Sequence, residues 1–298
     1  MSLKNLSTEN KDKRNEKLES LKIGLRNDFL NKRYQEFNNK IEQAMLEFVH
    51  PQQKYDRYSR YTPYTLDVTE IYSLPEYVNA SMVTFKDSRT YTCVMNPKIK
   101  YKKEFEDFLI FSNTDLIVSL NQILPERIPM NKHHEYDKNI CEQFDYLLNN
   151  DNFQLAKSDN IDNIFEDQFF IFKPGSKYEK TIRRLKFLQW PDFRVPNLDD
   201  FLLFYNYYQR VVDAYNLGDN KRSPIVVHCL AGVGRTGTFV CFDVINRMLK
   251  KSKDPSEAEI FDTIFEVLYR AKSQRNGMVQ TDSQISMLVD YFTKVYGN

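Results

Sequence analysis

A cysteine and an arginine six residues apart frame the stretch PIVVHCLAGVGRTGTF. Gly232, Gly234 and Gly237 fall within or just after the loop from Cys229 to Arg235, although the whole chain has only 8 glycines. Glycines between a strand and a helix N-terminus allow backbone N–H groups to form an anion cradle. A cysteine in such a cradle is expected to have a lowered pKa and to act as a nucleophile. The arginine fork can bind two phosphate oxygens.

Two other interpretations compete for this stretch. The three glycines spell GxGxxG, but in a dinucleotide-binding fold they follow the strand directly, whereas residues 228–231 intervene here. Alternatively, Cys229 is a buried structural residue and Arg235 a surface one. The cysteine–arginine pair alone is weak evidence. Together with the strand, the glycines, His228 and Thr236, it favours a nucleophile at a phosphate site.

The elements beside this loop are the clearest of the chain. Residues 224–227 form an apolar, β-branched run typical of a buried strand, and residues 236–249 suit the helix that follows. Asn197 is expected to cap a helix that ends at Gly218. Capping boxes predict two later helices, at Ser256 with Glu259 and at Thr281 with Gln284.

The earlier part of the chain is expected to begin with a charged tail over residues 1–17. Apolar residues at helical spacing then predict two helices between 18 and 48, ended by His50-Pro51. Residues 53–96 are typical of short strands and loops, and 121–165 of polar loops. Further predicted elements are a short helix at 105–110 and strands at 116–120, 169–172 and 180–188.

Length and composition favour one α/β domain with a helical N-terminal addition. The chain has 298 residues, and 42 basic against 41 acidic residues give a net charge of +1, which argues against a general nucleic-acid binder. No apolar run has the ~18 residues of a membrane helix, and the N-terminus lacks a secretory apolar region. The four cysteines are irregularly spaced, so free thiols and no metal site are expected.

Five motifs resemble those of the protein tyrosine phosphatases. HCLAGVGRTG closely resembles the signature loop of that family. It occupies residues 228–237. Upstream, WPDF at 190–193 looks like the mobile acid loop of the family, and GMVQTDSQ at 277–284 is similar to its glutamine loop. KYDRY at 54–58 is similar to the phosphotyrosine-recognition motif, and EYVNAS at 76–81 to the strand after that motif. They follow the family's order, and the resemblance covers about residues 25–296.

The resemblance implies a twisted mixed β-sheet flanked by helices on both sides, in one catalytic domain over residues 18–298. It also implies the phosphotyrosine-specific branch, with phosphotyrosine-containing proteins as partners and no cofactor. The Asn-, Lys- and Tyr-rich composition resembles virus-encoded members, notably those of polydnaviruses such as bracoviruses. A monomer without nucleic-acid or membrane binding is expected in the cytoplasm, that of the host cell if the chain is viral.

In the first step that the resemblance implies, Cys229 attacks phosphorus and forms a phosphocysteine. Arg235 and the loop amides hold the phosphate oxygens, where charge develops. Asp192 protonates the leaving tyrosine oxygen, whose pKa near 10 makes it a poor leaving anion at neutral pH. Without this role, Asp192 is an ordinary loop aspartate. The remaining residues of the phosphate loop are Leu230, Ala231, Gly232, Val233 and Gly234.

In the second step, Asp192 acts as base on a water that Gln280 and Gln284 position. Gln284 also suits a plain helix cap. Thr236 is expected to hydrogen-bond the leaving thiolate, unless it is only an N-terminal helix residue. Tyr58 is expected to stack on the substrate ring and set the depth of the pocket.

His228 is expected to order the loop, and Trp190 of the acid loop is expected to support the site from behind. Glu126 is expected to pair with Arg235 or to be exposed. Two departures from the family pattern are Arg60, where an aspartate is usual, and Arg194, where glycine is common. They motivate a phosphotyrosine-binding module with weak or no turnover as an alternative.

A further alternative is a phosphoinositide or RNA phosphatase that uses the same loop. The basic stretches at 98–103 and 183–184 keep it open, although charge runs are usually solvated faces. The other departures are Leu230, where serine is usual, and VMNP at 94–97. At Leu230 only the backbone amide is needed, so the site should survive.

Overall fold

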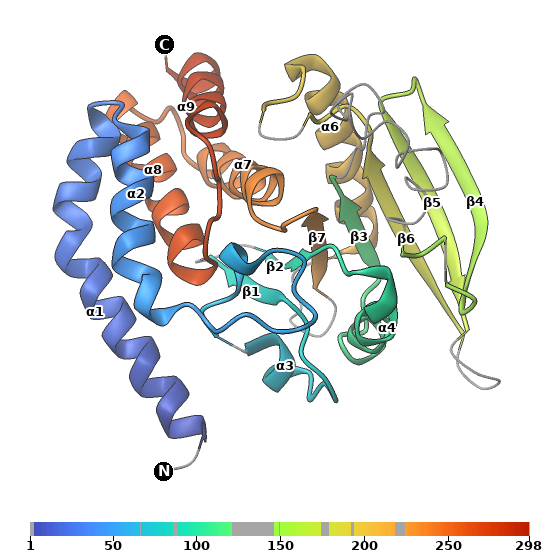
Figure 1. Ribbon diagram of the computed structural model, residues 1–298. Coiled ribbons are helices and arrows are strands. Elements are labelled where there is room, and N and C mark those ends of the chain that lie inside the picture. The colour runs from blue at the N-terminus through green and yellow to red at the C-terminus, as the bar shows by residue number, and fades with distance from the viewer. Residues whose placement is uncertain are drawn as a thin grey trace, which may run out of the picture.

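The strand that ends in Cys229 lies in the middle of a seven-stranded mixed sheet (Figure 1). The strand order is β1-β2-β7-β3-β6-β5-β4. The central strands β2, β7, β3 and β6 pair in parallel, and β1, β5 and β4 extend the sheet through antiparallel pairs. The strands are β1 (Ala80–Thr84), β2 (Thr90–Met95), β3 (Leu116–Ser119), β4 (Phe153–Ile161), β5 (Phe165–Phe172), β6 (Lys180–Phe187) and β7 (Ile225–Cys229).

This computed structural model describes residues 3–65, 67–85, 89–120, 146–148, 150–173, 179–191, 194–217 and 224–297. Its α-helices are α1 (Leu3–Leu30), α2 (Tyr34–Met45), α3 (Asp67–Ile71), α4 (Lys102–Phe111), α6 (Leu198–Tyr215), α7 (Gly234–Lys251), α8 (Glu257–Gln274) and α9 (Asp282–Tyr296). Short 3₁₀ turns occur at η1 (Leu46–Phe48), η2 (Ser59–Tyr61) and η3 (Ile99–Tyr101).

Helices cover both faces of the sheet. Helices α3 and α4 pack on one face, and α6, α7, α8 and α9 on the other, with α1 and α2 outside α8 and α9 (Figure 1). Along β7, Ile225 and Val227 face the larger core and Val226 the smaller one. Burial on both faces explains the continuous apolar run that predicted this strand. The mixed sheet flanked by helices, with added N-terminal helices, is confirmed.

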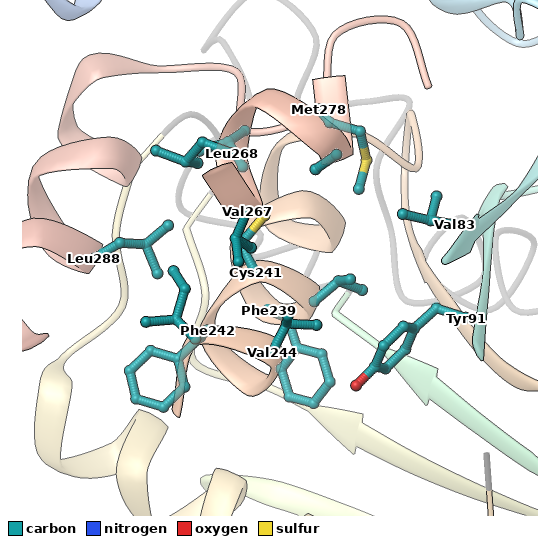
Figure 2. Packing of buried hydrophobic residues seen from close by; sticks show 14 of the residues in the cluster. Val83, Tyr91, Phe239, Cys241, Phe242, Val244, Val267, Leu268, Met278 and Leu288 are labelled. Carbon is teal, nitrogen blue, oxygen red and sulfur yellow. The ribbon is translucent and has the colours of Figure 1, made fainter. Parts of the chain in front are cut away.

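Helix α7 runs through the larger core and holds the end of the signature loop. Phe239, Cys241, Phe242 and Val244 are fully buried and meet side chains from α8, α9, β1 and β2 (Figure 2). Asp243 on the same helix is also fully buried and accepts hydrogen bonds from tyrosines on β2 and α6. A helix packed on all sides cannot shift easily, so its first turn is a rigid support for the loop.

The segment expected to be a polar tail is largely helical, because α1 begins at Leu3. Arg14 is 6% exposed and lies 5.2 Å above the ring of Tyr64. Lys17 forms an ion pair with Glu47. These contacts come from residues far along the chain, so the local polar composition did not reveal them.

The prediction of polar loops over 121–165 was wrong at its C-terminal end. Residues 153–161 form β4, and β5 begins at Phe165. Strand β4 is one of the two edge strands of this sheet, and most of its side chains are exposed or only partly buried, so the sequence lacks a strand's alternation. Helix α6 is closed by Asn216 in the left-handed conformation (φ 48°). Gly218 lies outside the described residues.

Candidate active site

A cavity of about 200 Å³ opens where β7 meets α7. Cys229, the last residue of β7, lies at its base and is only 3% exposed. Cys229 pairs with Met95 on β2. The residue before it, His228, pairs with Ser119 on β3. The pocket lies at the carboxyl ends of parallel strands, the usual place for ligands in such sheets. Its lining residues are Tyr58, Tyr61, Cys229, Leu230, Ala231, Gly234, Arg235, Gln280 and Gln284.

Close backbone approach requires glycine at two positions, one in the loop and one in the first turn of α7. Gly232 has φ +70°, and a Cβ there would lie 2.2 Å from the carbonyl oxygen of Val94. At Gly237 a Cβ would lie 2.5 Å from the backbone nitrogen of Val279. The loop is therefore pressed against β2 on one side and the glutamine loop on the other, and only glycine fits at either position.

The loop carbonyls are engaged by groups outside the pocket. The oxygen of Leu230 accepts a hydrogen bond from the backbone N–H of Asn96 (3.0 Å). Gly232 O accepts from Arg275 Nε (2.8 Å), and Val233 O accepts from the backbone N–H of Val279 (3.2 Å). With the carbonyls held in this way, the N–H groups of the same loop are available to an anion in the pocket.

Arg235 is 2% exposed and lines the pocket. Its Nη1 donates to the carbonyl oxygen of Trp190 (3.2 Å), which ties the phosphate loop to the start of the acid loop. Trp190 is fully buried against Phe187 and Phe201, and its Nε1 donates to Arg194 O (2.9 Å). The predicted general acid, Asp192, and the predicted partner Glu126 lie outside the described residues.

His228 and Thr236 lie beside the loop rather than in the pocket lining. His228 is 1% exposed, and its Nε2 is 3.1 Å from the hydroxyl of Tyr146. Thr236, in the first turn of α7, is fully buried, and its hydroxyl has no hydrogen-bond partner among the described residues. Gly232 and Val233 are likewise outside the pocket lining. Val233 is fully buried directly before α7.

The two glutamines come together at one wall of the pocket. Gln284 Oε1 accepts from the backbone N–H of Gln280 (2.9 Å) and of Thr281 (3.2 Å), so it closes the capping box of α9 and also lines the pocket. Gln280 Nε2 donates to the hydroxyl of Tyr61. Both functions considered for Gln284 are thus compatible in one position.

Tyr58 also lines the pocket and is 40% exposed, so its ring lies at the solvent-accessible part of the lining. The turn before it is fixed by Asp56, which is fully buried and accepts hydrogen bonds from Tyr77 Oη (2.9 Å) and Asn79 Nδ2 (2.8 Å). Arg57 donates to the backbone oxygen of Pro97 (2.7 Å). An aromatic ring at the mouth of the pocket is therefore held by a rigid turn.

Arg60, the departure from the family pattern, extends from this turn toward α2. Its Nη2 lies 2.8 Å from Glu42 Oε2, and its side chain is 70% exposed. The position two residues after Tyr58 therefore carries a cation that pairs with the N-terminal helical addition, and it is not part of the pocket lining.

Sequence reasoning missed two residues of the site. Tyr61 lines the pocket and accepts the hydrogen bond of Gln280. Arg275 is fully buried and bridges the phosphate loop to β1 through Asn79 Oδ1 (2.8 Å) and Ser81 Oγ (3.2 Å). The available signals were the position of Tyr61 three residues after Tyr58 and an arginine directly before the glutamine loop.

Within the described ranges, no helix combines the length and apolar character needed to cross a membrane. In the same ranges, no three His, Cys, Asp or Glu side chains gather where they could hold a metal ion.

The chain is similar in sequence to curated tyrosine-protein phosphatases. The chain is 27% identical over 251 residues to the cattle receptor-type tyrosine-protein phosphatase F, a match that covers 82% of this chain and 12% of that protein. It is 25% identical over 253 residues to the rat tyrosine-protein phosphatase non-receptor type 20, covering 82% of this chain and 54% of the relative. The chain thus spans only part of the length of these curated relatives.

Solved structures share the fold. The structure of PTPN18 in complex with HER2-pY1248 phosphopeptides superposes with a TM-score of 0.66 at 18% identity, covering 90% of this chain and 99% of that one. The Trypanosoma cruzi phosphatase TcPTP1 gives a TM-score of 0.60 at 15% identity, covering 88% and 92%. The family model described as protein-tyrosine phosphatase matches residues 52–294, most of the chain. The chain therefore belongs to the protein-tyrosine phosphatase family.

Proposed function

We propose that this chain hydrolyses phosphotyrosine in proteins through a phosphocysteine intermediate. The observation that carries the proposal is the single cavity of about 200 Å³ that brings together a buried cysteine, a buried arginine, two glutamines and two tyrosines. Membership of the family and the likeness of the fold to a phosphopeptide-bound phosphatase support the same substrate class.

In the first step, the Cys229 thiolate attacks phosphorus, the S–P bond forms and the P–O bond to the tyrosine ring breaks. The guanidinium of Arg235 and the loop amides stabilise the charge on the phosphate oxygens. Asp192 gives its proton to the departing phenolate oxygen, a contribution of about 10²–10⁴-fold for a positioned general acid. This loop follows the carboxyl end of β7, an interior strand of the sheet (Figure 1).

In the second step, water attacks the phosphocysteine, the S–P bond breaks and inorganic phosphate leaves. Gln280 and Gln284 position the water, and Asp192 takes its proton. The buried hydroxyl of Thr236 is available to donate a hydrogen bond to the leaving thiolate, because no described residue accepts one from it.

Tyr58 and Tyr61 define the substrate class. Tyr58 stands half-exposed at the mouth, where its ring can stack on the phenyl ring of the substrate. Tyr61 accepts a hydrogen bond from Gln280 and occupies part of the pocket lining. A phosphorylated ring spans the distance from this rim to the buried cysteine better than a short phosphoserine side chain.

The proposal is tested by hydrolysis of para-nitrophenyl phosphate and of phosphotyrosine, phosphoserine and inositol phosphate substrates. Cys229→Ser should abolish turnover, and Asp192→Ala should lower kcat by about 10²–10⁴-fold. Cys241→Ser, a buried cysteine outside the pocket, is the matched control and should retain activity.

A wild-type protein that binds phosphotyrosine peptide without turning it over would instead be a binding module, the alternative motivated by Arg60 and Arg194. Faster turnover of inositol phosphates than of phosphotyrosine peptides would refute the substrate class.

A further inference from the structure

A buried lysine on α8 holds the backbone that precedes Gln280. Lys272 is 5% exposed, and its Nζ donates to the carbonyl oxygens of Met278 (2.5 Å) and Val279 (2.8 Å). These carbonyls belong to the two residues directly before the pocket glutamine. A single ammonium therefore fixes the start of the glutamine loop.

The backbone that Lys272 holds is in a conformation that its sequence disfavours. Val279 has φ 54°, although it is β-branched and fully buried. A left-handed valine is a genuine outlier and costs about 1–3 kcal/mol unless its surroundings enforce it. The same residue donates its N–H to Val233 O in the phosphate loop, so its conformation also affects that loop.

Lys272 keeps its positive charge, which strengthens its hydrogen bonds to this backbone. Burial lowers the pKa of Lys272 to about 8, while the charges of Glu42 on α2 and Asp282 on α9 and the thiol of Cys241 on α7 oppose that change. The side chain thus remains mostly protonated at neutral pH. Its Nζ also lies 5.8 Å from the ring of Phe37. Charge-assisted hydrogen bonds to carbonyls are about twice as strong as neutral ones.

We infer that Lys272 is a positioning residue for the second chemical step, because it holds the glutamine loop in the geometry that places Gln280 against Tyr61. This inference rests on the proposed function. Loss of the ammonium frees two carbonyls and removes a support of the left-handed valine. The glutamine then moves away from the attacking water. The phosphate loop loses at most its one hydrogen bond with Val279 and keeps those of Gly232 O with Arg275 and of Arg235 with Trp190 O, so the first step is affected less.

The experiment is rapid-quench kinetics with para-nitrophenyl phosphate on Lys272→Met, Lys272→Arg and the exposed control Lys250→Met. The burst of nitrophenol measures formation of the phosphocysteine, and the steady state measures its hydrolysis when that step is slow. Lys272→Met should keep the burst rate within about threefold. It should slow hydrolysis by about tenfold or more, since misplacement by about 1 Å can cost about 100-fold.

Lys272→Arg retains a cation able to donate to both carbonyls and should recover most of the hydrolysis rate. Lys250→Met should match the wild type. Equal loss in both steps without recovery in Lys272→Arg, or no change in Lys272→Met, would overturn the inference. Wild-type protein that gives neither burst nor turnover would refute the proposed function instead.

Hydrogen exchange tests the inference independently of activity. Amides of residues 277–284 should exchange faster in Lys272→Met than in the wild type, and those of α6 should not change. The double variant Lys272→Met/Val279→Gly should regain part of the hydrolysis rate, because glycine adopts a positive φ without strain. Unchanged exchange at 277–284 would refute the positioning role whether or not the protein turns over substrate.

Discussion

Replacement of Arg275 by methionine tests how the phosphate loop is held. The guanidinium is fully buried, and its two closest acceptors are Gly232 O and Asn79 Oδ1, both at 2.8 Å. Methionine keeps an apolar stem but donates nothing, so both acceptors lose a donor. A buried acceptor left unsatisfied costs about 1–3 kcal/mol, which gives about 2–6 kcal/mol for the pair. That is a large share of the about 5–15 kcal/mol that stabilises a typical domain.

The assay is urea unfolding followed by the fluorescence of Trp190, the single tryptophan of the chain. Arg270→Met is the matched control, because it makes the same change at an exposed position of α8, the helix that ends directly before Arg275. We expect Arg275→Met to lose about 2–6 kcal/mol and Arg270→Met to stay within about 0.5 kcal/mol of the wild type. If the two variants unfold within about 1 kcal/mol of each other, the buried bridge to Gly232 does not support the loop as argued.

Two further predictions concern the loop backbone and alkaline pH. Gly232→Ala should abolish phosphatase activity and lower the unfolding midpoint, because its Cβ would lie 2.2 Å from a carbonyl oxygen of β2; Gly24→Ala, with nothing within 4 Å, should leave both intact. Burial raises the pKa of Cys93 to about 12 and that of Cys241 further, and lowers that of Lys272 to about 8. Above the ordinary cysteine pKa of about 8.5, ionisation of each thiol in the unfolded chain lowers the stability of the protein as pH rises, whereas Lys272, which is then mostly neutral in the folded protein and charged in the unfolded chain, raises it. The net loss is about 0.9 kcal/mol between pH 8.5 and 9.5. Urea unfolding at pH 8.5 and 9.5 should show this slope, and Cys241→Ala should flatten it; a slope unchanged in that variant would contradict the assignment.

The N-terminal helical addition contacts segments that support the site. Glu42 on α2 pairs with Arg60, two residues after the pocket residue Tyr58, and contributes to the electrostatic surroundings of Lys272. Phe37 on the same helix packs against Phe265 on α8. Helix α2 therefore supports both the recognition turn and the glutamine loop, although it contributes no side chain to the pocket lining.

Features that depend on neighbours in the chain could be predicted from the amino-acid sequence. A β-branched run followed by glycines and a helix predicted β7, the loop and α7. The capping boxes at Ser256 and Thr281 were found where expected, because a cap and its partner are three residues apart. The order of the motifs predicted the mixed sheet, since the short motif segments are specific to the family.

The distant groups that support the site could not be predicted in this way, because they meet only in the folded chain. Arg275 reaches Asn79, and Lys272 and Arg14 are buried by residues from other helices and loops. Charged side chains are usually exposed, so composition gives no sign that these three are buried. The edge strand β4 escaped detection for the opposite reason: with little of it buried, it carries no alternating pattern. Local periodicity records which face of an element is buried, whereas the partner of a buried charge depends on how the chain packs.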